Sequence, residues 1–549
     1  MGAISRALVS SAICLCAAAC SPSDKAVTNG AAVAGGEGAI NLEQGWSAEV
    51  QQRAWFTSFG SRLIPTRWLQ ALELSGNDEP FMSERNLEAI GFLLQAKTPA
   101  NPEGFPVGFT QQTDAEGRAW TGLGCAACHT GEVRYQGHRI RIDGGQGTLD
   151  FNLFELSLAA SLQATINHDA SFRRFAAAQG VAADQLDALK QEVSELADRI
   201  LARHRMNEVT VPYGHGRLDA FGQIFNAVSV QFLGLPQNRR APDAPVSFPV
   251  LWDAPHLDVV QWNGSAPNAG PGPLLQNITT ALAVYGSLDI HRPAGIDGYA
   301  SSIDFAHLDQ IENDLYALQS PQWPSAILGA LDAGRVGRGA QIYSKECVSC
   351  HQLSERNDPK RELKAVITPL DEVGTDPRMA RNFLDSVSDS GAFEGRKQGV
   401  VFGPELEARA QTSDLVVHAA VGAALGHPLE SVRNALMSFH REIGSPLNPH
   451  PDGYKARPLS GIWASAPYLH NGSVPTLAEL LEAPSQRASQ FFVGSRQFDP
   501  QTVGLATARG ENADLFDTSL PGNSNAGHAY GTDLADDAKR DLLEYLKSL

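Results

Sequence analysis

The stretch GLGCAACHTG, residues 122–131, holds two cysteines separated by two residues, with a histidine directly after the second. The same pattern returns as CVSCH at residues 347–351. Two exact copies are very improbable by chance in a chain with 7 cysteines and 15 histidines. The repeat therefore indicates a chemistry that needs this spacing twice.

The spacing suits covalent attachment of haem. Two thiols at this separation can each form a thioether with a haem vinyl group, and the adjacent histidine then directs its imidazole at the iron. A redox dithiol or half of a zinc site is the alternative, but neither explains a histidine after the second cysteine in both copies. We expect two covalently bound haem c groups. The attaching residues are then Cys125, Cys128, Cys347 and Cys350, and the axial ligands are His129 and His351.

The other three cysteines lie in the first twenty residues. MGAISRALVSSAICLCAAAC has an arginine ahead of a short apolar run and small residues before Cys20, as in a secretory signal too short to span a bilayer. Its end, AAAC at 17–20, resembles a bacterial lipobox. We expect a lipoprotein-type signal peptide over 1–20, loss of Cys14 and Cys16, and a lipid on Cys20. An ordinary cleaved signal is the alternative. Haem c is attached outside the cytoplasm, which suits an exported protein of the periplasm or cell envelope.

Length and composition set the expected organisation. The 549 residues are 43% hydrophobic and include 51 Gly and 32 Pro, enough for two cores joined by many loops. The formal charge of -18 argues against a nucleic-acid partner. We expect a flexible linker over 21–45, with the folded part beginning near Trp46. An N-terminal haem domain over 46–325 and a C-terminal cytochrome c domain over 326–549 should follow.

Helical periodicity dominates the body of the chain. Apolar residues at three- and four-residue spacing predict helices over 153–165, 183–205, 274–286 and 303–318, and strand patterns are sparse and short. Turn-rich stretches such as NPEGFPVGF, 101–109, separate them. The expected fold is mainly α, with two cytochrome c-like haem domains, extensive loops and little β.

The second haem motif lies in the frame of a small cytochrome. Gly339 and Tyr343 are four residues apart, on one face of a helix that runs into Cys347. The chain ends in another predicted helix, ADDAKRDLLEYLKSL, residues 535–549. In cytochrome c folds such terminal helices cross over the haem.

The stretch ARPLSGIWASAPYLHNGSVPTLAELL, residues 456–481, is similar to the TAPY-x-H-[DN]-GS-x-x-TL segment of the bacterial di-haem cytochrome c peroxidase and MauG superfamily. Further stretches resemble its RoxA-type branch, the di-haem rubber oxygenases and their relatives. These are FGSRLIPTRWLQALE (59–73), NPEGFPVGFT (101–110), GLGCAACHTGEVRYQGHRIRIDGG (122–145), FPVLWDAPHLDVVQWNG (248–264) and GNSNAGHAYG (522–531). The resemblance extends over most of the chain.

The resemblance implies that chemistry happens at the N-terminal haem, bound through His129, while the C-terminal haem relays or stores electrons. The sixth ligand of each iron then decides between oxygen or peroxide binding and electron transfer. Rubber oxygenases leave the distal side of the N-terminal haem without a protein ligand. A peroxidase would supply a histidine there, for which His138 and His215 are candidates, and an ordinary surface or core histidine is the alternative for each.

At the C-terminal haem, the methionine that a peroxidase would supply is missing, because the chain has no Met beyond Met437. His528, Tyr530 and His470 remain as candidates. Rubber oxygenases resemble bis-histidine proteins at this haem, which favours His528. His470 is then expected to order the loop between the haems, with an ordinary loop histidine as the alternative. Arg457 is expected to pair with a haem propionate, with a surface salt bridge as the alternative.

The distal pocket of the N-terminal haem is expected from 248–264 and from PLLQNITTALAVYG, 273–286. Aromatic bulk there would exclude water, and amides would donate to bound oxygen. For any single aromatic residue, core packing is the alternative. The pocket candidates that join His129 as catalytic residues are Trp252, Trp262, Asn263 and Asn277.

Three functions fit these observations. The first is an oxygenase that activates dioxygen at the His129 haem and cleaves an apolar, polyisoprenoid-like substrate, and the missing methionine and branch-level motifs favour it. The second is a peroxidase that reduces hydrogen peroxide with electrons from a small redox protein. The third is an electron carrier without a substrate. A lipid anchor to the membrane suits a smaller lipid or an envelope electron partner better than an insoluble polymer.

Overall fold

The structure, a computed structural model, describes residues 33–34, 38–294, 298–438 and 452–549. Helices account for 40% of the residues and strands for 17%, and the largest sheet has four strands. The predicted mainly α class is confirmed. Cys14, Cys16 and Cys20 lie outside the described residues. Within these ranges, no helix is both long and apolar enough to cross a membrane.

The first haem motif lies between two small sheets. Strand β4 (Phe109–Thr113) pairs with β5 (Ala119–Leu123), which leads directly into the motif. A single 3-10 turn, η2 (Cys125–Ala127), carries the first cysteine. Strand β6 (Thr130–Tyr135) then leaves the motif and returns as β7 (His138–Asp143). The motif is therefore fixed at both ends by strand pairing.

The folded body begins earlier than the expected position near Trp46. Strand β2 (Ala39–Asn41) pairs with β7 in parallel, and β1 (Val33–Ala34) pairs with β2. The buried Gln44 side chain donates to the carbonyls of Asp143 and Gln319. These contacts join segments far apart in sequence and leave no local periodicity, so composition alone indicated a linker.

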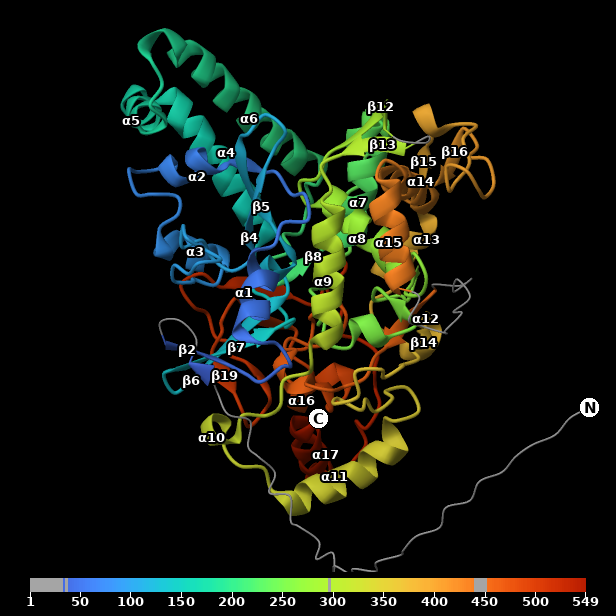
Figure 1. The fold of residues 1–549 in the computed structure, drawn as a ribbon. Coiled ribbons are helices and arrows are strands. Elements are labelled where there is room, and N and C mark those ends of the chain that lie inside the picture. The colour runs from blue at the N-terminus through green and yellow to red at the C-terminus, as the bar shows by residue number, and fades with distance from the viewer. Residues whose placement is uncertain (1–32, 35–37, 295–297, 439–451) are drawn as a thin grey trace, which may run out of the picture.

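Long helices cover this part of the molecule. Helices α4 (Phe151–Asn167), α5 (Asp169–Gln179) and α6 (Leu186–Met206) project at the upper left of Figure 1, while α8 (Gly272–Ala283) and α9 (Phe305–Ala317) stand near its centre. The four helices predicted from apolar spacing are present, with ends shifted by a few residues. Other helices here are α1 (Ala48–Phe56), α2 (Thr66–Ala71), α3 (Glu84–Ile90) and α7 (Ala220–Asn226).

The terminal helices of the second half cross as predicted. Helix α11 (Ala333–Glu346) runs into the second haem motif and packs on α17 (Asp536–Ser548) at the bottom of Figure 1. A Cβ on Gly339 would lie 2.1 Å from the carbonyl oxygen of Asp541, so the crossing requires glycine. The rings of Tyr343 and Tyr545 lie 5.3 Å apart beside it.

The second half also completes the core of the first. Helix α14 (Thr412–Leu425) packs on α8 and on the hairpin of β12 (Leu288–Ala294) and β13 (Gly298–Ser301). Its Leu415 and Ala419 belong to the same buried cluster as residues of α8. The two halves are therefore interlocked, and the domain boundary expected near 325 stays a prediction.

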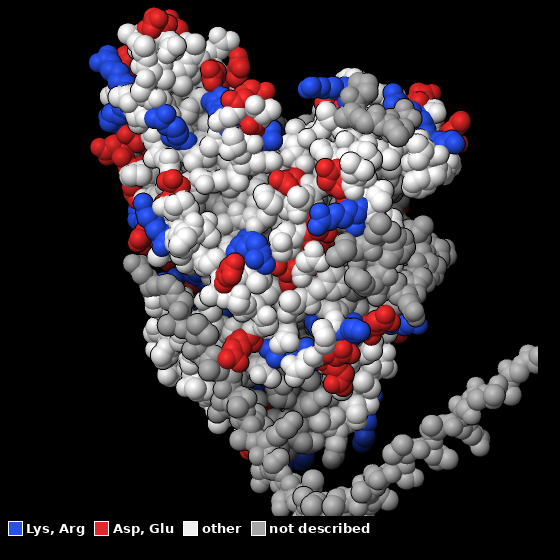
Figure 2. All heavy atoms as spheres, viewed as in Figure 1, with Lys and Arg blue, Asp and Glu red and all other residues white. Residues whose placement is uncertain are grey.

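The outer surface carries mixed charges. On the face shown in Figure 2, acidic and basic side chains are interspersed and do not gather into a patch of one sign. A notch opens at the upper edge, between the projecting helices α4 to α6 and the part of the molecule that contains β12 and β13. Helix α6 borders this notch.

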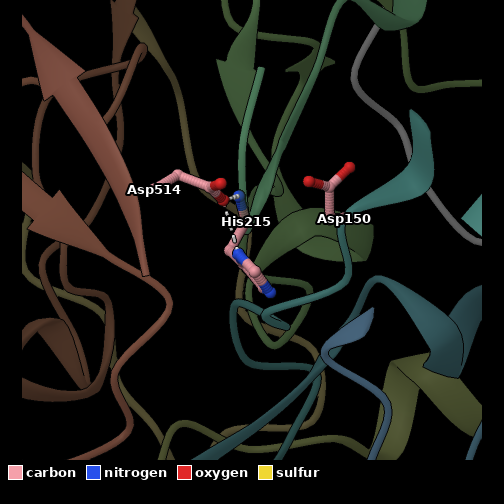
Figure 3. A group of neighbouring side chains, drawn as sticks. All are labelled: Asp150, His215 and Asp514. Carbon is pink, nitrogen blue, oxygen red and sulfur yellow. Dashed lines mark hydrogen bonds and ion pairs between the residues drawn. The ribbon is translucent and has the colours of Figure 1, made fainter. Parts of the chain in front are cut away.

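One ionic contact fastens the C-terminal segment to the first half of the chain. His215 Nδ1 lies 2.6 Å from Asp514 Oδ2, and Nε2 lies 3.1 Å from the carbonyl oxygen of Ala89. Both ring nitrogens thus face acceptors, which requires a protonated imidazole. Burial lowers the pKa of His215, but the hydrogen bond and charge of Asp514 outweigh burial and raise it. Figure 3 shows the Asp150 carboxylate near this pair but turned away from the imidazole.

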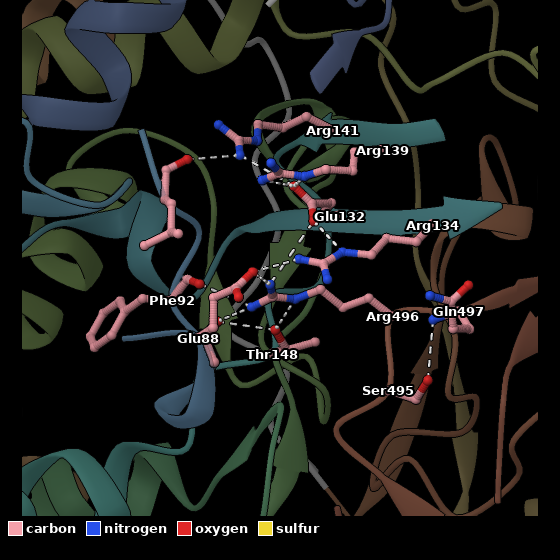
Figure 4. Close-up of polar contacts among 12 residues, drawn as sticks. Glu88, Phe92, Glu132, Arg134, Arg139, Arg141, Thr148, Ser495, Arg496 and Gln497 are labelled. Atoms are coloured by element: carbon pink, nitrogen blue, oxygen red, sulfur yellow. Dashed lines mark hydrogen bonds and ion pairs between the residues drawn. The ribbon is translucent and has the colours of Figure 1, made fainter. Parts of the chain in front are cut away.

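A group of arginines surrounds Glu132, whose side chain is 0% exposed. Arg134, Arg139 and Arg141 lie 2.9, 3.1 and 3.3 Å from its carboxylate (Figure 4). Arg496, from the C-terminal segment, donates to the carbonyls of Gly91 and Phe92. Burial would raise the pKa of Glu132, but the charges of Arg496 and Arg141 outweigh it and lower the pKa to about 2. The carboxylate therefore stays ionised inside the fold.

Candidate haem sites

The CAACH turn presents its histidine in the form that binds metal. The amides of Cys128 and His129 both donate to the carbonyl of Cys125 and close the turn, and the two cysteines form no disulfide. His129 Nδ1 donates to the carbonyl oxygen of Pro249 at 2.8 Å, which leaves Nε2 as the unprotonated nitrogen. Burial lowers the pKa of His129 to about 4. A neutral imidazole with a fixed tautomer fits an axial haem ligand.

The CVSCH turn repeats this arrangement. His351 Nδ1 donates to the carbonyl oxygen of Arg457 at 2.7 Å, and Cys347 and Cys350 are free thiols. The ring of His528 faces that of His351 with 6.2 Å between centroids. Two imidazoles bound to one metal at about 2 Å each place their ring centres roughly 6 Å apart. The pair therefore fits a single iron held between His351 and His528.

The space around this pair is lined by basic groups. The two histidines border a space of about 1440 Å³, part of which is open to solvent. Lys455 and Arg457 line it too, and neither makes an ion pair with a carboxylate of the described residues. Burial, then the nearby Arg457, lowers the pKa of Lys455 to about 7, and burial lowers that of Arg457 to about 10. Two buried basic groups that form no ion pair among the described residues fit an anionic ligand such as a haem with its propionates.

The surroundings of His129 differ. It shares a smaller cavity, of about 330 Å³, with Cys125, Trp55 and the α9 residues Ile311 and Leu315. The ring of Phe248 lies beside that of His129, with 6.2 Å between centroids. Among the described residues that line this cavity, none is a second histidine or a methionine. The cavity of His129 thus lacks the second imidazole that faces His351.

The four distal-pocket candidates are not brought together. The buried Trp252 packs in the core around Trp463, and its Nε1 donates to the carbonyl of Ser460. Trp262 lines the cavity of the second motif. The other two lie elsewhere: Asn263 is buried, with its Oδ1 accepting from the amide of Ser265, and Asn277 donates to Glu312 Oε1 at 2.7 Å.

The remaining histidine and tyrosine candidates lie in different parts of the structure. His138 is an exposed residue at the start of β7, and His215 is held by Asp514. His470 lines the cavity of the second motif and stacks on Tyr454 at 3.9 Å. Burial lowers the pKa of His470 to about 3. Tyr530 packs edge-on against His528, with 5.2 Å between ring centroids.

The Asp150, His215 and Asp514 group does not fit a metal site, although its ligand atoms lie within 4.8 Å of one another. A metal needs a bare imidazole nitrogen, whereas both nitrogens of His215 face acceptors. The carboxylate of Asp150 also caps α4 by accepting from the amide of Leu153. The geometry fits a protonated histidine that joins two segments.

Comparison with known proteins agrees with a haem protein. A family model described as "RoxA-like, cytochrome c-like" matches residues 453–492. The uncharacterised protein y4iJ of Sinorhizobium fredii is 31% identical over 580 aligned positions, which cover 92% of this chain and 93% of y4iJ. This chain belongs to the y4iJ family.

Two further proteins resemble this member of the y4iJ family. The uncharacterised protein y4iM of Sinorhizobium fredii is 27% identical over 340 positions, 57% of this chain and 67% of y4iM. The mitochondrial cytochrome c1-1 heme protein of Solanum tuberosum is 37% identical over 62 positions, 11% of this chain and 19% of that protein. The y4iJ-family protein thus contains a RoxA-like, cytochrome c-like domain, which implies haem c.

Sequence reasoning missed several groups that build the sites of this y4iJ-family protein. Lys455 was overlooked, although it lies two residues before Arg457 in the matched segment. The backbone carbonyls of Pro249 and Arg457, which orient the rings of His129 and His351, carry no side-chain signal in the sequence.

Proposed function

We propose that this y4iJ-family protein is a di-haem oxygenase, which activates dioxygen at the haem held by His129 and cleaves an apolar, polyisoprenoid-like substrate. The difference between the two axial histidines carries the proposal. His351 faces a second imidazole, that of His528, whereas His129 has Phe248 beside it and an apolar cavity. An iron with one protein ligand can bind dioxygen, and an iron with two favours electron transfer.

The residues of the chain have distinct parts in this proposal. Bound haem supplies the oxygen-binding chemistry. The carbonyl of Pro249 holds the His129 ring in one tautomer, and Ile311 and Leu315 keep the cavity apolar. At the second site, Lys455 and Arg457 would balance the charge of the propionates.

The second haem is proposed as the entry point for electrons from a small redox protein. Its motif lies near the surface, where Val348, Leu353 and Tyr530 are 39%, 48% and 39% exposed. Exposed apolar side chains of this kind fit the centre of a weak protein interface. The first motif has no comparably exposed apolar residue among Cys125, Ala126, Ala127 and Cys128.

The first experiment is the optical spectrum of the dithionite-reduced protein with and without carbon monoxide, scaled to a pyridine-haemochrome count. We expect two haems per chain, of which one binds carbon monoxide, and oxygen-dependent cleavage of polyisoprenoids. Failure of both haems to bind carbon monoxide would contradict the proposal. Peroxide reduction without polyisoprenoid cleavage would indicate the peroxidase function instead.

The proposal includes export to the cell envelope and a lipid anchor at Cys20, a residue outside the described ranges. The lipobox-like AAAC sequence and the need to attach haem c outside the cytoplasm support it. Radiolabelled palmitate should enter the wild type and not Cys20→Ala. Equal labelling of the two proteins would rule out this anchor.

A further inference from the structure

A further cavity is formed by the hairpin of β12 and β13, by helix α14 and by the loop over 395–405. It has a volume of about 1320 Å³, part of which is open to solvent. Among the described residues, none that lines it also lines the cavity of either haem motif. Its elements lie at the upper right of Figure 1, whereas α11 and the second haem motif lie at the bottom. Neither haem site therefore explains this cavity.

Two buried side chains on the wall of the cavity form a directed chain of hydrogen bonds. His418 Nδ1 donates to the carbonyl oxygen of Lys397 at 2.7 Å, so its Nε2 is the acceptor nitrogen and receives the hydroxyl of Tyr299 at 2.7 Å. The Tyr299 oxygen in turn accepts from Arg396 Nη1 at a longer distance of 3.4 Å. Burial raises the pKa of Tyr299 and lowers that of His418, so both groups are neutral near neutral pH. The chain therefore ends on a guanidinium.

The surroundings hold Tyr299 in one position. Gly422 of α14 faces its ring, and a Cβ there would lie 2.2 Å from Tyr299 Cδ2. Phe393 stacks on the Tyr299 ring with 6.0 Å between centroids and lies 4.3 Å from the ring centroid of His418. A glycine inside a helix lowers the stability of that helix, so this close approach of Tyr299 to α14 has a cost. The pair is packed for a fixed geometry.

The backbone around Arg396 is also fixed. The amide of Leu406 donates to the carbonyl of Arg396, and the amide of Gly395 donates to the carbonyl of Leu406. Farther along the loop, Val400 has a φ of 62°, an outlier for a β-branched residue, and such residues gather at ligand-binding sites. A guanidinium has five N–H donors, and among the described residues only the Tyr299 oxygen accepts from that of Arg396. The other donors remain for a ligand.

The lining of the cavity favours an anion with an apolar part. Three basic side chains line it, those of Arg396, Lys397 and His291, together with one carboxylate, that of Glu405. None of these four groups forms an ion pair with another described residue. The apolar side chains of the lining are Ile290, Val400 and Val401.

We propose that this cavity binds an organic carboxylate, which accepts from two N–H groups of Arg396 while its apolar end lies against Val400 and Val401. Guanidinium and carboxylate groups are both planar and pair through two parallel hydrogen bonds. Tyr299 and His418 are positioning residues, because they act through Arg396. The site is separate from the proposed oxygenase reaction and does not depend on it.

Isothermal titration calorimetry of the full-length di-haem protein with acetate, butanoate, hexanoate and inorganic phosphate tests the site. Hexanoate should bind more tightly than acetate, because its longer chain buries more apolar surface. Arg396→Gln should weaken hexanoate binding by about tenfold or more, since charge-assisted hydrogen bonds are strong. Arg409→Gln is the matched control, because Arg409, on β16 (Arg409–Gln411), is 66% exposed and does not line the cavity.

The outcomes that contradict the proposal are distinct. Failure of hexanoate to bind the wild type, or equal binding to the wild type and Arg396→Gln, would overturn the site. Binding of phosphate but of no carboxylate would overturn the ligand class. Carbon monoxide binding should be the same in every variant, so this test is scored separately from the proposed function.

Tyr299→Phe tests the hydrogen-bond chain. It keeps the ring but removes the oxygen that holds Arg396, so hexanoate affinity should fall by about threefold as preorganisation is lost. In the Arg396→Gln background the same substitution should have no further effect, because two residues that act through one contact are not additive. Equal losses in the two backgrounds would contradict a positioning role for Tyr299.

Discussion

At the scale of residues, the two candidate haem sites differ in what their histidines face. His129 and His351 both donate through Nδ1 to a backbone carbonyl, so their Nε2 atoms are prepared alike. His351 faces the imidazole of His528, whereas no second imidazole among the described residues lines the cavity of His129. In the proposed function, the reactivity of the second iron therefore depends on His528.

We predict that His528→Ala opens the second iron. Loss of the imidazole should convert a low-spin haem into a high-spin form that binds carbon monoxide, so the binding stoichiometry should rise from one to two per chain. Optical and electron paramagnetic resonance spectra would measure it, with Tyr530→Phe as the control that stays at one. An unchanged spectrum in His528→Ala would indicate that Tyr530 or His470 is the ligand instead.

The residues that sequence could assign are those adjacent in the chain. Cys125, Cys128 and His129 were assigned because one short motif holds all the chemistry. Trp262 was expected at the first haem but lies at the second, since a segment between two cavities can serve either. The direction in which the Trp262 side chain points depends on contacts such as the hydrogen bond from its Nε1 to the carbonyl of Ser247. Such contacts leave no pattern in the sequence.

At the scale of elements, helices were predictable and their partners were not. The apolar spacing in α4, α6, α8 and α9 marks helices of ordinary length, because each buries one face. The pairing of β2 with β7 links segments about a hundred residues apart. Such pairing is set by the completed core, and composition gave no sign of it.

The crossing of α11 and α17 yields a prediction for stability. Gly339→Ala would place a Cβ 2.1 Å from the carbonyl oxygen of Asp541, so unfolding should become easier by about 1–3 kcal/mol, as in other overpacked contacts. Gly337→Ala, on the same helix with nothing within 4 Å of its Cβ, should instead be neutral or stabilising by up to about 1 kcal/mol. Urea unfolding measures both. Equal effects would show that the helices do not cross this closely.

At the scale of the whole molecule, the C-terminal segment holds the fold together through buried charge. The pKa of Glu132 falls from 4.5 to about 2 in the folded state. The carboxylate therefore stabilises the fold above its ordinary pKa, by roughly 3 kcal/mol, and this contribution is lost as the pH falls from about 4.5 to 2.

Glu132→Gln should accordingly lower stability at pH 7 and flatten its decline in acid, as followed by urea unfolding at several pH values. The matched control is Glu88→Gln, because Glu88 belongs to the same network but its side chain is 41% exposed. If the free energy of unfolding fell as steeply in acid for Glu132→Gln as for the wild type, other carboxylates would be responsible for the decline.

The burial of the motif cysteines has a consequence for biogenesis. Burial raises the pKa of Cys125 to about 11 and that of Cys128 to about 12, and in the second motif it raises that of Cys347 to about 11 as well. Thioether formation proceeds from the ionised thiol, so the closed fold disfavours it at both motifs. The maturation machinery is therefore expected to load both haems onto a nascent, still open chain.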